Sequence, residues 1–70
     1  MTTTADVMRL AHITYRQADY WVRVGWLRVP AVGSGQHRDW SLDEVAVACR
    51  MGAFVEVGFG PARAAEMARR

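Results

Sequence analysis

The sequence contains no lysine and no asparagine, and it has one cysteine and two prolines among its 70 residues. One cysteine forms no internal disulfide, and one cysteine with two separate histidines lacks the spacing of a metal site. No apolar run approaches the ~18 residues of a membrane span, and the first residues lack the basic and apolar parts of a signal peptide. We therefore expect a cytoplasmic protein with no metal, no cofactor and no membrane contact.

The length limits the size of any core. A chain of this length folds as one small domain and buries about 60% of the surface that its unfolded form exposes, so a deep enclosed active site is not expected. With 51% hydrophobic residues and a net charge of +2, the composition also excludes intrinsic disorder. His12 and His37 have no carboxylate or nucleophile at a useful spacing, so we expect no catalytic residue and no enzyme.

All nine basic residues are arginines, whose planar guanidinium groups suit bidentate contacts to phosphate or guanine. Their distribution is uneven. Residues 1–38 carry five arginines against two acids (net +3), residues 39–62 one arginine against four acids (net −3), and residues 63–70 three arginines against one acid (net +2). The modest total charge therefore conceals a basic first half.

The first half of the chain predicts two short helices. The first begins in the cluster Thr2 to Thr4, any of which can cap a helix, and it places Val7, Leu10 and Ala11 on one face. The sequence Thr-Tyr-Arg-Gln from Thr14 has the form of a capping box and predicts a second helix to about residue 24, which Gly25 ends in a left-handed conformation.

The second predicted helix carries two stripes of residues, one apolar and one polar. The apolar stripe, which we expect to face the core, consists of Ala18, Trp21, Val22 and Gly25. The polar stripe consists of Arg16, Asp19, Tyr20 and Arg23, with Gln17 beside it. A solvated surface is the simplest interpretation of such a stripe, but arginine, tyrosine and amide side chains are also those that contact phosphates and base edges in a major groove.

The remaining segments predict a β-hairpin and two helices. Residues 28–40 form two extended segments around Gly33-Ser34-Gly35. Ser41-Leu-Asp-Glu44 reads as a second capping box and opens a helix over about 41–57. The buried flank of this helix is predicted to hold Val45, Ala48, Cys49, Gly52 and Val55, with Phe54 nearby. Pro61 opens a last helix over about 61–70, which is poor in apolar area and should fray unless another element packs on it.

This order of elements resembles the winged-helix DNA-binding domain of the MerR family over nearly the whole chain. The most specific part is the run from Thr14 to Leu27, Thr-Tyr-Arg-Gln-Ala-Asp-Tyr-Trp-Val-Arg-Val-Gly-Trp-Leu, which is similar to the family's recognition helix. Trp40 and the Gly58-Phe59 pair also match family positions. The resemblance implies a fold that is mainly α with a small β-hairpin, a winged helix-turn-helix forming one DNA-binding domain over residues 1–70.

The resemblance also implies a recognition helix over about 14–25 and a wing over about 28–40. The predicted DNA-binding residues are Thr14, Tyr15, Arg16, Gln17, Asp19, Tyr20, Arg23, Arg28, His37 and Arg38. Arg9 and the Arg69-Arg70 pair are further candidates for phosphate contacts. Two positions depart from the family pattern, because His12 stands where a turn glycine is usual and Asp19 where an arginine is common.

MerR regulators normally continue into a dimerisation helix and an effector domain. A winged helix of this size resembles instead the small phage excisionases (Xis, recombination directionality factors) of mycobacteriophage type. That resemblance implies a DNA-bending architectural protein, without a small-molecule effector, that promotes integrase-mediated prophage excision. Its expected partners are double-stranded DNA with tandem sites in the arms of an attachment site, a phage integrase, and further copies of itself bound cooperatively.

Two alternatives remain open. A small MerR-like transcriptional regulator without an effector domain would use the same groove contacts at a promoter. A protein interaction module that does not bind DNA would leave the arginine and tyrosine stripe without a purpose.

Overall fold

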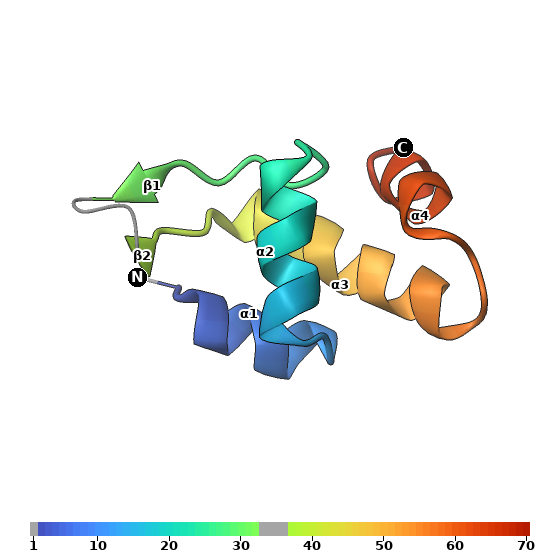
Figure 1. The fold of residues 1–70 in the computed structure, drawn as a ribbon, viewed down its shortest axis with the longest axis horizontal. Helices are drawn as coiled ribbons and strands as arrows, with labels where there is room; N and C mark the ends of the chain where they lie inside the picture. The colour runs from blue at the N-terminus through green and yellow to red at the C-terminus, as the bar shows by residue number, and fades with distance from the viewer. Residues whose placement is uncertain (1, 33–36) are drawn as a thin grey trace.

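The structure, a computed structural model, describes residues 2–32 and 37–70, with the backbone alone described at 31, 32, 37 and 38. The described part is mostly helical, as predicted. Its elements are α1 (Thr4–Ala11), α2 (Tyr15–Arg23), β1 (Ala31–Val32), β2 (His37–Arg38), α3 (Leu42–Glu56) and α4 (Pro61–Ala68). Helix α2 crosses in front of α1 and α3, with the strands at one end of the molecule and α4 at the other (Figure 1).

Local hydrogen bonds fix both ends of α1. The Thr3 hydroxyl accepts from the backbone N–H of Asp6 at 3.2 Å, and the Asp6 carboxylate accepts from the backbone N–H of Thr3 at 3.0 Å. The helix ends at His12, whose φ of 56° is left-handed. Histidine is tolerated at this position, where a turn glycine is usual in the family, because it enters the left-handed region more readily than most residues.

Helix α2 ends as predicted, at a glycine with positive φ. Gly25 has a φ of 88°. Its N–H donates to the carbonyl of Val22 at 3.1 Å, and the N–H of Trp26 donates to the carbonyl of Trp21 at 3.0 Å. This pair of bonds is a Schellman motif, which satisfies the last carbonyls of the helix and turns the chain back towards the core.

The predicted extended segments within residues 28–40 pair over two residues each. Ala31 lies opposite Arg38 and Val32 opposite His37, in antiparallel register. The predicted turn Gly33-Ser34-Gly35 lies outside the described residues. After β2, Trp40 forms hydrogen bonds to residues at the start of α1.

Two hydrogen bonds make that connection. The backbone N–H of Trp40 donates to the carbonyl of Thr2, and its indole N–H donates to the Thr4 hydroxyl, both at 3.1 Å. The base of the paired strands is therefore held against α1 by a residue that is itself only 3% exposed.

Helix α3 forms only half of its predicted capping box. The Ser41 hydroxyl accepts from the backbone N–H of Glu44 at 3.2 Å, but the Glu44 carboxylate binds elsewhere, as described below. At the other end Gly58, with a φ of 113°, closes the helix. The rings of Phe54 and Phe59 pack edge to face, with their centroids 5.8 Å apart. An apolar contact of this kind commonly accompanies a helix end that is closed by a left-handed glycine.

The core lies where α3 is enclosed by α1 on one side and α4 on the other. Its buried residues are Val7, Ala11, Ile13, Ala18, Trp21, Leu27, Val29, Trp40, Val47, Ala48, Met51, Ala64, Ala65 and Ala68. Val47 and Met51 are buried although neither belongs to the flank predicted for this helix, because α3 has two packed sides. Leu10, which helical spacing places on one face of α1 with Val7 and Ala11, is 58% exposed, whereas the other two residues are buried.

Helix α4 packs against α3 through small side chains. Ala64, Ala65 and Ala68 are 6% exposed or less, and they allow the two helix backbones to approach closely. The Arg50 side chain of α3 donates from Nε to the carbonyl of Ala68 at 2.8 Å, near the end of α4. The last helix therefore has the packing partner that its own sequence required.

Candidate nucleic-acid interface

The predicted capping box at the start of α2 is confirmed. The Thr14 hydroxyl accepts from the backbone N–H of Gln17 at 3.1 Å, and Oε1 of Gln17 accepts from the backbone N–H of Thr14 at 2.9 Å. These bonds fix the first turn of the helix, where a helix-turn-helix protein places its base-reading residues. In the unbound chain, the side-chain oxygen of Gln17 is therefore already bound to the backbone N–H of Thr14.

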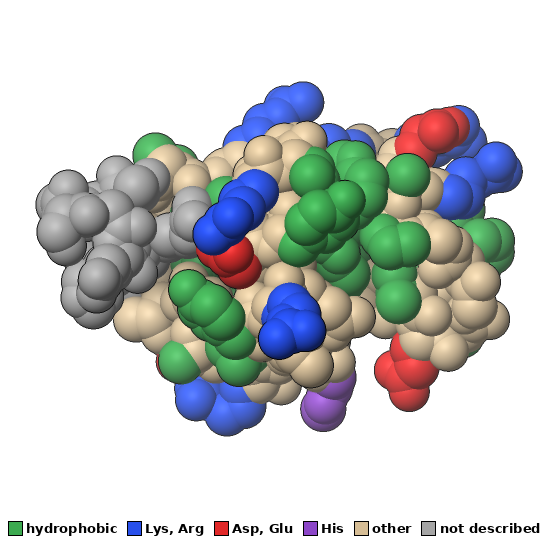
Figure 2. Space-filling view, viewed as in Figure 1, with side chains coloured by type: hydrophobic (Ala, Val, Ile, Leu, Met, Phe, Trp, Pro, Cys, Tyr) green, Lys and Arg blue, Asp and Glu red, His purple; other side chains and the backbone are tan. Residues whose placement is uncertain are grey.

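The outer face of α2 is exposed and carries the predicted polar stripe. Arg16 and Arg23 are exposed, and Tyr15 and Tyr20 are 59% and 53% exposed. Figure 2, viewed from the side on which α2 lies in front, shows arginine and hydrophobic side chains gathered around this helix. The structure therefore brings together on one surface most of the α2 residues that the sequence predicted to contact DNA.

Asp19 and Arg23 form an ion pair on this face. Oδ2 of Asp19 lies 2.9 Å from Nε of Arg23, one helical turn further along α2. The Arg23 side chain is 72% exposed, whereas that of Asp19 is only 21% exposed. The direct base contact predicted for Asp19 stays a prediction, and its carboxylate binds Arg23 in the unbound chain.

An aromatic pair extends the face of α2 towards α4. The rings of Tyr20 and Trp26 meet edge to face with centroids 5.9 Å apart. Beside Tyr20 lies an open hollow of about 390 Å³, lined by Thr14, Arg16, Gln17, Tyr20, Trp21 and Pro61. The start of α4 thus borders the same surface as the first turns of α2.

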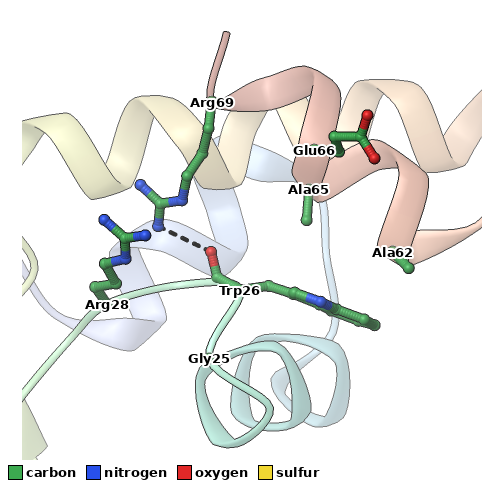
Figure 3. A pocket seen from close by; sticks show the side chains of 7 residues that line it. All are labelled: Gly25, Trp26, Arg28, Ala62, Ala65, Glu66 and Arg69. Carbon is green, nitrogen blue, oxygen red and sulfur yellow. Dashed lines mark hydrogen bonds between the residues drawn. The ribbon is translucent and has the colours of Figure 1, made fainter.

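Arg28 lies in the segment after α2, and its backbone is held by Glu44. Its N–H donates to Oε1 of Glu44 at 2.6 Å, while its side chain is exposed. In Figure 3 the guanidinium groups of Arg28 and Arg69 lie close together on one side of the connection from α2 to β1. The DNA contact predicted for Arg28 stays a prediction, and the structure shows an exposed residue whose backbone is fixed.

Glu44 joins three parts of the fold. It is only 8% exposed, and its two carboxylate oxygens accept hydrogen bonds from the Arg69 guanidinium at 2.6 and 3.0 Å. Arg69 also donates to the carbonyl of Trp26 at 2.8 Å (Figure 3). The hydrogen bonds from Arg69, supported by the backbone N–H of Arg28, hold the pKa of Glu44 below its usual value although burial opposes this.

The position of Arg69 differs from the one predicted from the sequence. Arg69 was a candidate for phosphate contact, but its guanidinium is directed inward to Glu44 and the connection after α2. No local signal reveals the pair, because the two residues are 25 positions apart. Arg9 and Arg70 remain exposed and pair with nearby acids, Asp6 and Glu66, at 2.8 Å each.

The two wing residues of the predicted interface are placed by their backbones alone. His37 and Arg38 form β2, and both pair with β1. Their side chains lie outside the described part of the structure, so their predicted phosphate contacts stay predictions.

Two features of other classes of protein are absent from the described residues. Within residues 2–32 and 37–70, no helix combines the length and hydropathy that a bilayer span requires. In the same ranges, no group of three His, Cys, Asp or Glu side chains is arranged to hold a metal ion.

Comparison with known proteins places the chain in a family. No curated protein matches the sequence closely. Residues 2–70, which include every element described above, match the family described as MerR HTH family regulatory protein. Proteins of this kind bind DNA through their helix-turn-helix. With α1 and α2 separated by a short turn at His12, and with this match over almost its whole length, the chain belongs to the MerR family of helix-turn-helix regulatory proteins.

Proposed function

We propose that this protein binds double-stranded DNA in a sequence-specific way, with α2 lying in the major groove. The observation that carries the proposal is the exposed stripe of Arg16, Tyr20 and Arg23 on the second helix of a MerR-type helix-turn-helix. Recognition helices of this kind insert their first turns into the groove. Arg16 lies in the first turn of α2.

The arginines divide into two roles under this proposal. Arg16, in the first turn of α2, reads base edges, for which a guanidinium is suited by its bidentate contact to guanine. Arg23, Arg28 and Arg38 neutralise phosphates and set the orientation of the protein on the duplex. The paired strands act as the wing, which places Arg38 against the DNA backbone.

A single domain of this size forms a small interface with DNA, of about 600–1,000 Å². We therefore propose that several copies bind adjacent sites and that each stabilises its neighbour. When several copies contact one another on the same duplex, each bound copy raises the effective concentration of the next, and the overall affinity increases.

For the biological role, we propose an architectural factor of the excisionase type, which bends attachment-site DNA and contacts an integrase. The support is the resemblance of the sequence to small excisionases. The second candidate is a promoter-binding regulator, which the family's own description as regulatory proteins favours. The two roles use the same protein surface and differ in where the site lies.

A selection experiment tests DNA binding itself. Duplexes with a randomised central segment are incubated with the protein, and the bound fraction is amplified through repeated rounds. We expect enrichment of one motif and an affinity that falls steeply with salt, because phosphate contacts release counterions. Failure to enrich any motif, together with no salt-dependent binding to random duplex, would overturn the proposal.

A footprint on the DNA flanking the gene distinguishes the two roles. Protection of tandem repeats beside an integrase core site supports the excisionase role. Protection that overlaps a promoter supports the regulator.

A further inference from the structure

We propose that Asp19 is a positioning residue for DNA recognition: its carboxylate holds the Arg23 guanidinium in the orientation that contacts DNA. This inference rests on the proposed function of α2. A negatively charged side chain on the proposed DNA-binding face would then favour binding.

The geometry of the pair supports this role. Asp19 contacts Arg23 through Nε, at 2.9 Å. This contact is made at Nε, and the Arg23 side chain remains largely exposed, so its planar guanidinium is accessible to a phosphate or a guanine edge. The Asp19 side chain is only 21% exposed, so it offers a fixed anchor for an arginine that is 72% exposed.

Two physical effects of Asp19 on DNA binding have opposite signs. A carboxylate near the phosphates repels them, which weakens binding to every sequence. An arginine that is already oriented loses less conformational freedom when it binds, which strengthens binding where its geometry is used. Removal of the Asp19 charge therefore distinguishes the two effects by the direction in which the affinity changes.

The experiment compares four proteins: the wild type, Asp19→Asn, Arg23→Ala and the double variant. Affinities are measured by fluorescence anisotropy on the duplex that the wild type selects and on a random-sequence duplex. We expect Asp19→Asn to weaken binding to the selected duplex about three- to tenfold, as is common for coupled neighbouring residues. In the Arg23→Ala background the same substitution should weaken binding less than it does in the wild type, because the part of its effect that acts through Arg23 is then absent.

Helix α4 provides a matched control. Glu66, in α4, and Arg70, just after it, form an ion pair of the same i, i+4 spacing at 2.8 Å. Glu66→Gln removes one negative charge without disturbing Arg23, so it should raise the affinity slightly and equally for both duplexes. If Asp19→Asn binds the selected duplex as tightly as Glu66→Gln does, Asp19 has no positioning role, while DNA binding by α2 still stands. If the wild type binds no duplex, the proposed function fails first and the inference with it.

A second variant keeps the test informative if Asp19→Asn does not fold, as judged by far-ultraviolet circular dichroism. Arg23→Lys retains the positive charge but has neither Nε nor the planar fork. We expect it to lose affinity for the selected duplex, because lysine is a point charge that Asp19 does not orient as it orients the planar guanidinium. Wild-type affinity of Arg23→Lys for the selected duplex would overturn the inference.

Discussion

Arg69, at the end of α4, binds both carboxylate oxygens of Glu44, near the start of α3, and the same guanidinium donates to the carbonyl of Trp26. Glu44 in turn accepts from the backbone N–H of Arg28. Four hydrogen bonds thus connect α3, α4 and the segment that leads from α2 to the strands. The relative placement of the two proposed DNA-binding elements, α2 and the strands, depends on this connection.

Loss of Arg69 should therefore destabilise the fold. In Arg69→Ala the buried Glu44 carboxylate loses its cationic partner, and we expect a decrease of about 2–4 kcal/mol in the free energy of unfolding. Arg70→Ala is the matched control, because its pair with Glu66 is exposed and should contribute less than about 0.5 kcal/mol. Urea denaturation followed by circular dichroism measures both. Equal effects of the two substitutions would contradict the importance of the Glu44 pair.

The same pair predicts a dependence of stability on pH. Its hydrogen bonds lower the pKa of Glu44 in the folded state below its ordinary value of 4.5, so the unfolded chain binds the proton more readily. The stabilisation is complete above about pH 4.5 and is lost as the pH falls through the lower pKa of the folded state. The difference in unfolding free energy between the wild type and Glu44→Gln should therefore shrink as the pH falls from about 6 to about 3. A constant difference over that range would exclude this source of pH dependence.

Gly52→Ala tests the contact between α3 and α1. A Cβ atom at Gly52 would lie 2.6 Å from the carbonyl oxygen of Ala11 and 3.2 Å from Cγ2 of Ile13. Because the nearer atom belongs to the backbone, the two helices must separate, and we expect a loss of about 1–3 kcal/mol. Gly60→Ala has no neighbour within 4 Å and should change stability by less than about 0.5 kcal/mol. Thermal unfolding of the two variants compares them directly.

Arg16→Ala should weaken specific DNA binding by about 1–3 kcal/mol and relax the preference at one base position, if Arg16 contacts a base edge. The measurement is the affinity for the selected duplex and for single-base variants of it. Equal losses on selected and random duplex would show that Arg16 contacts phosphate instead.

Arg38→Ala should weaken binding to all sequences alike, because a phosphate contact carries no base information. The slope of log affinity against log salt should fall by about one, as expected for one lost phosphate contact. Anisotropy titrations at several salt concentrations give the slope. An unchanged slope with a changed base preference would reverse the assignment.

The parts of the fold that depend on neighbouring residues were predictable from the sequence. Thr14 and Gln17 form their capping box, and Gly25 ends α2 with a positive φ, because caps and turns are set within a few residues. The exposed stripe of α2 also followed from helical spacing alone.

The parts that depend on distant residues were not predictable in the same way. The Ser41 to Glu44 pattern is typical of a capping box, but a stronger cationic partner from the end of the chain takes the Glu44 carboxylate. Met51 is completely buried because α3 packs on two sides, which a single periodic stripe does not reveal. In the interface, the i, i+4 spacing of Asp19 and Arg23 is typical of a helical ion pair, but it gave no indication that the Asp19 side chain would be mostly buried.

The burial of the three tryptophans determines what the intrinsic fluorescence of this protein reports. Trp21 and Trp40 are 2% and 3% exposed, so a red shift of their emission accompanies loss of the core. Trp26, which follows α2 and is half-buried, packs edge to face against the exposed Tyr20 of that helix. Its emission is therefore the optical signal sensitive to a ligand on the surface of α2, and replacing Trp26 alone separates the spectroscopic record of binding from that of unfolding.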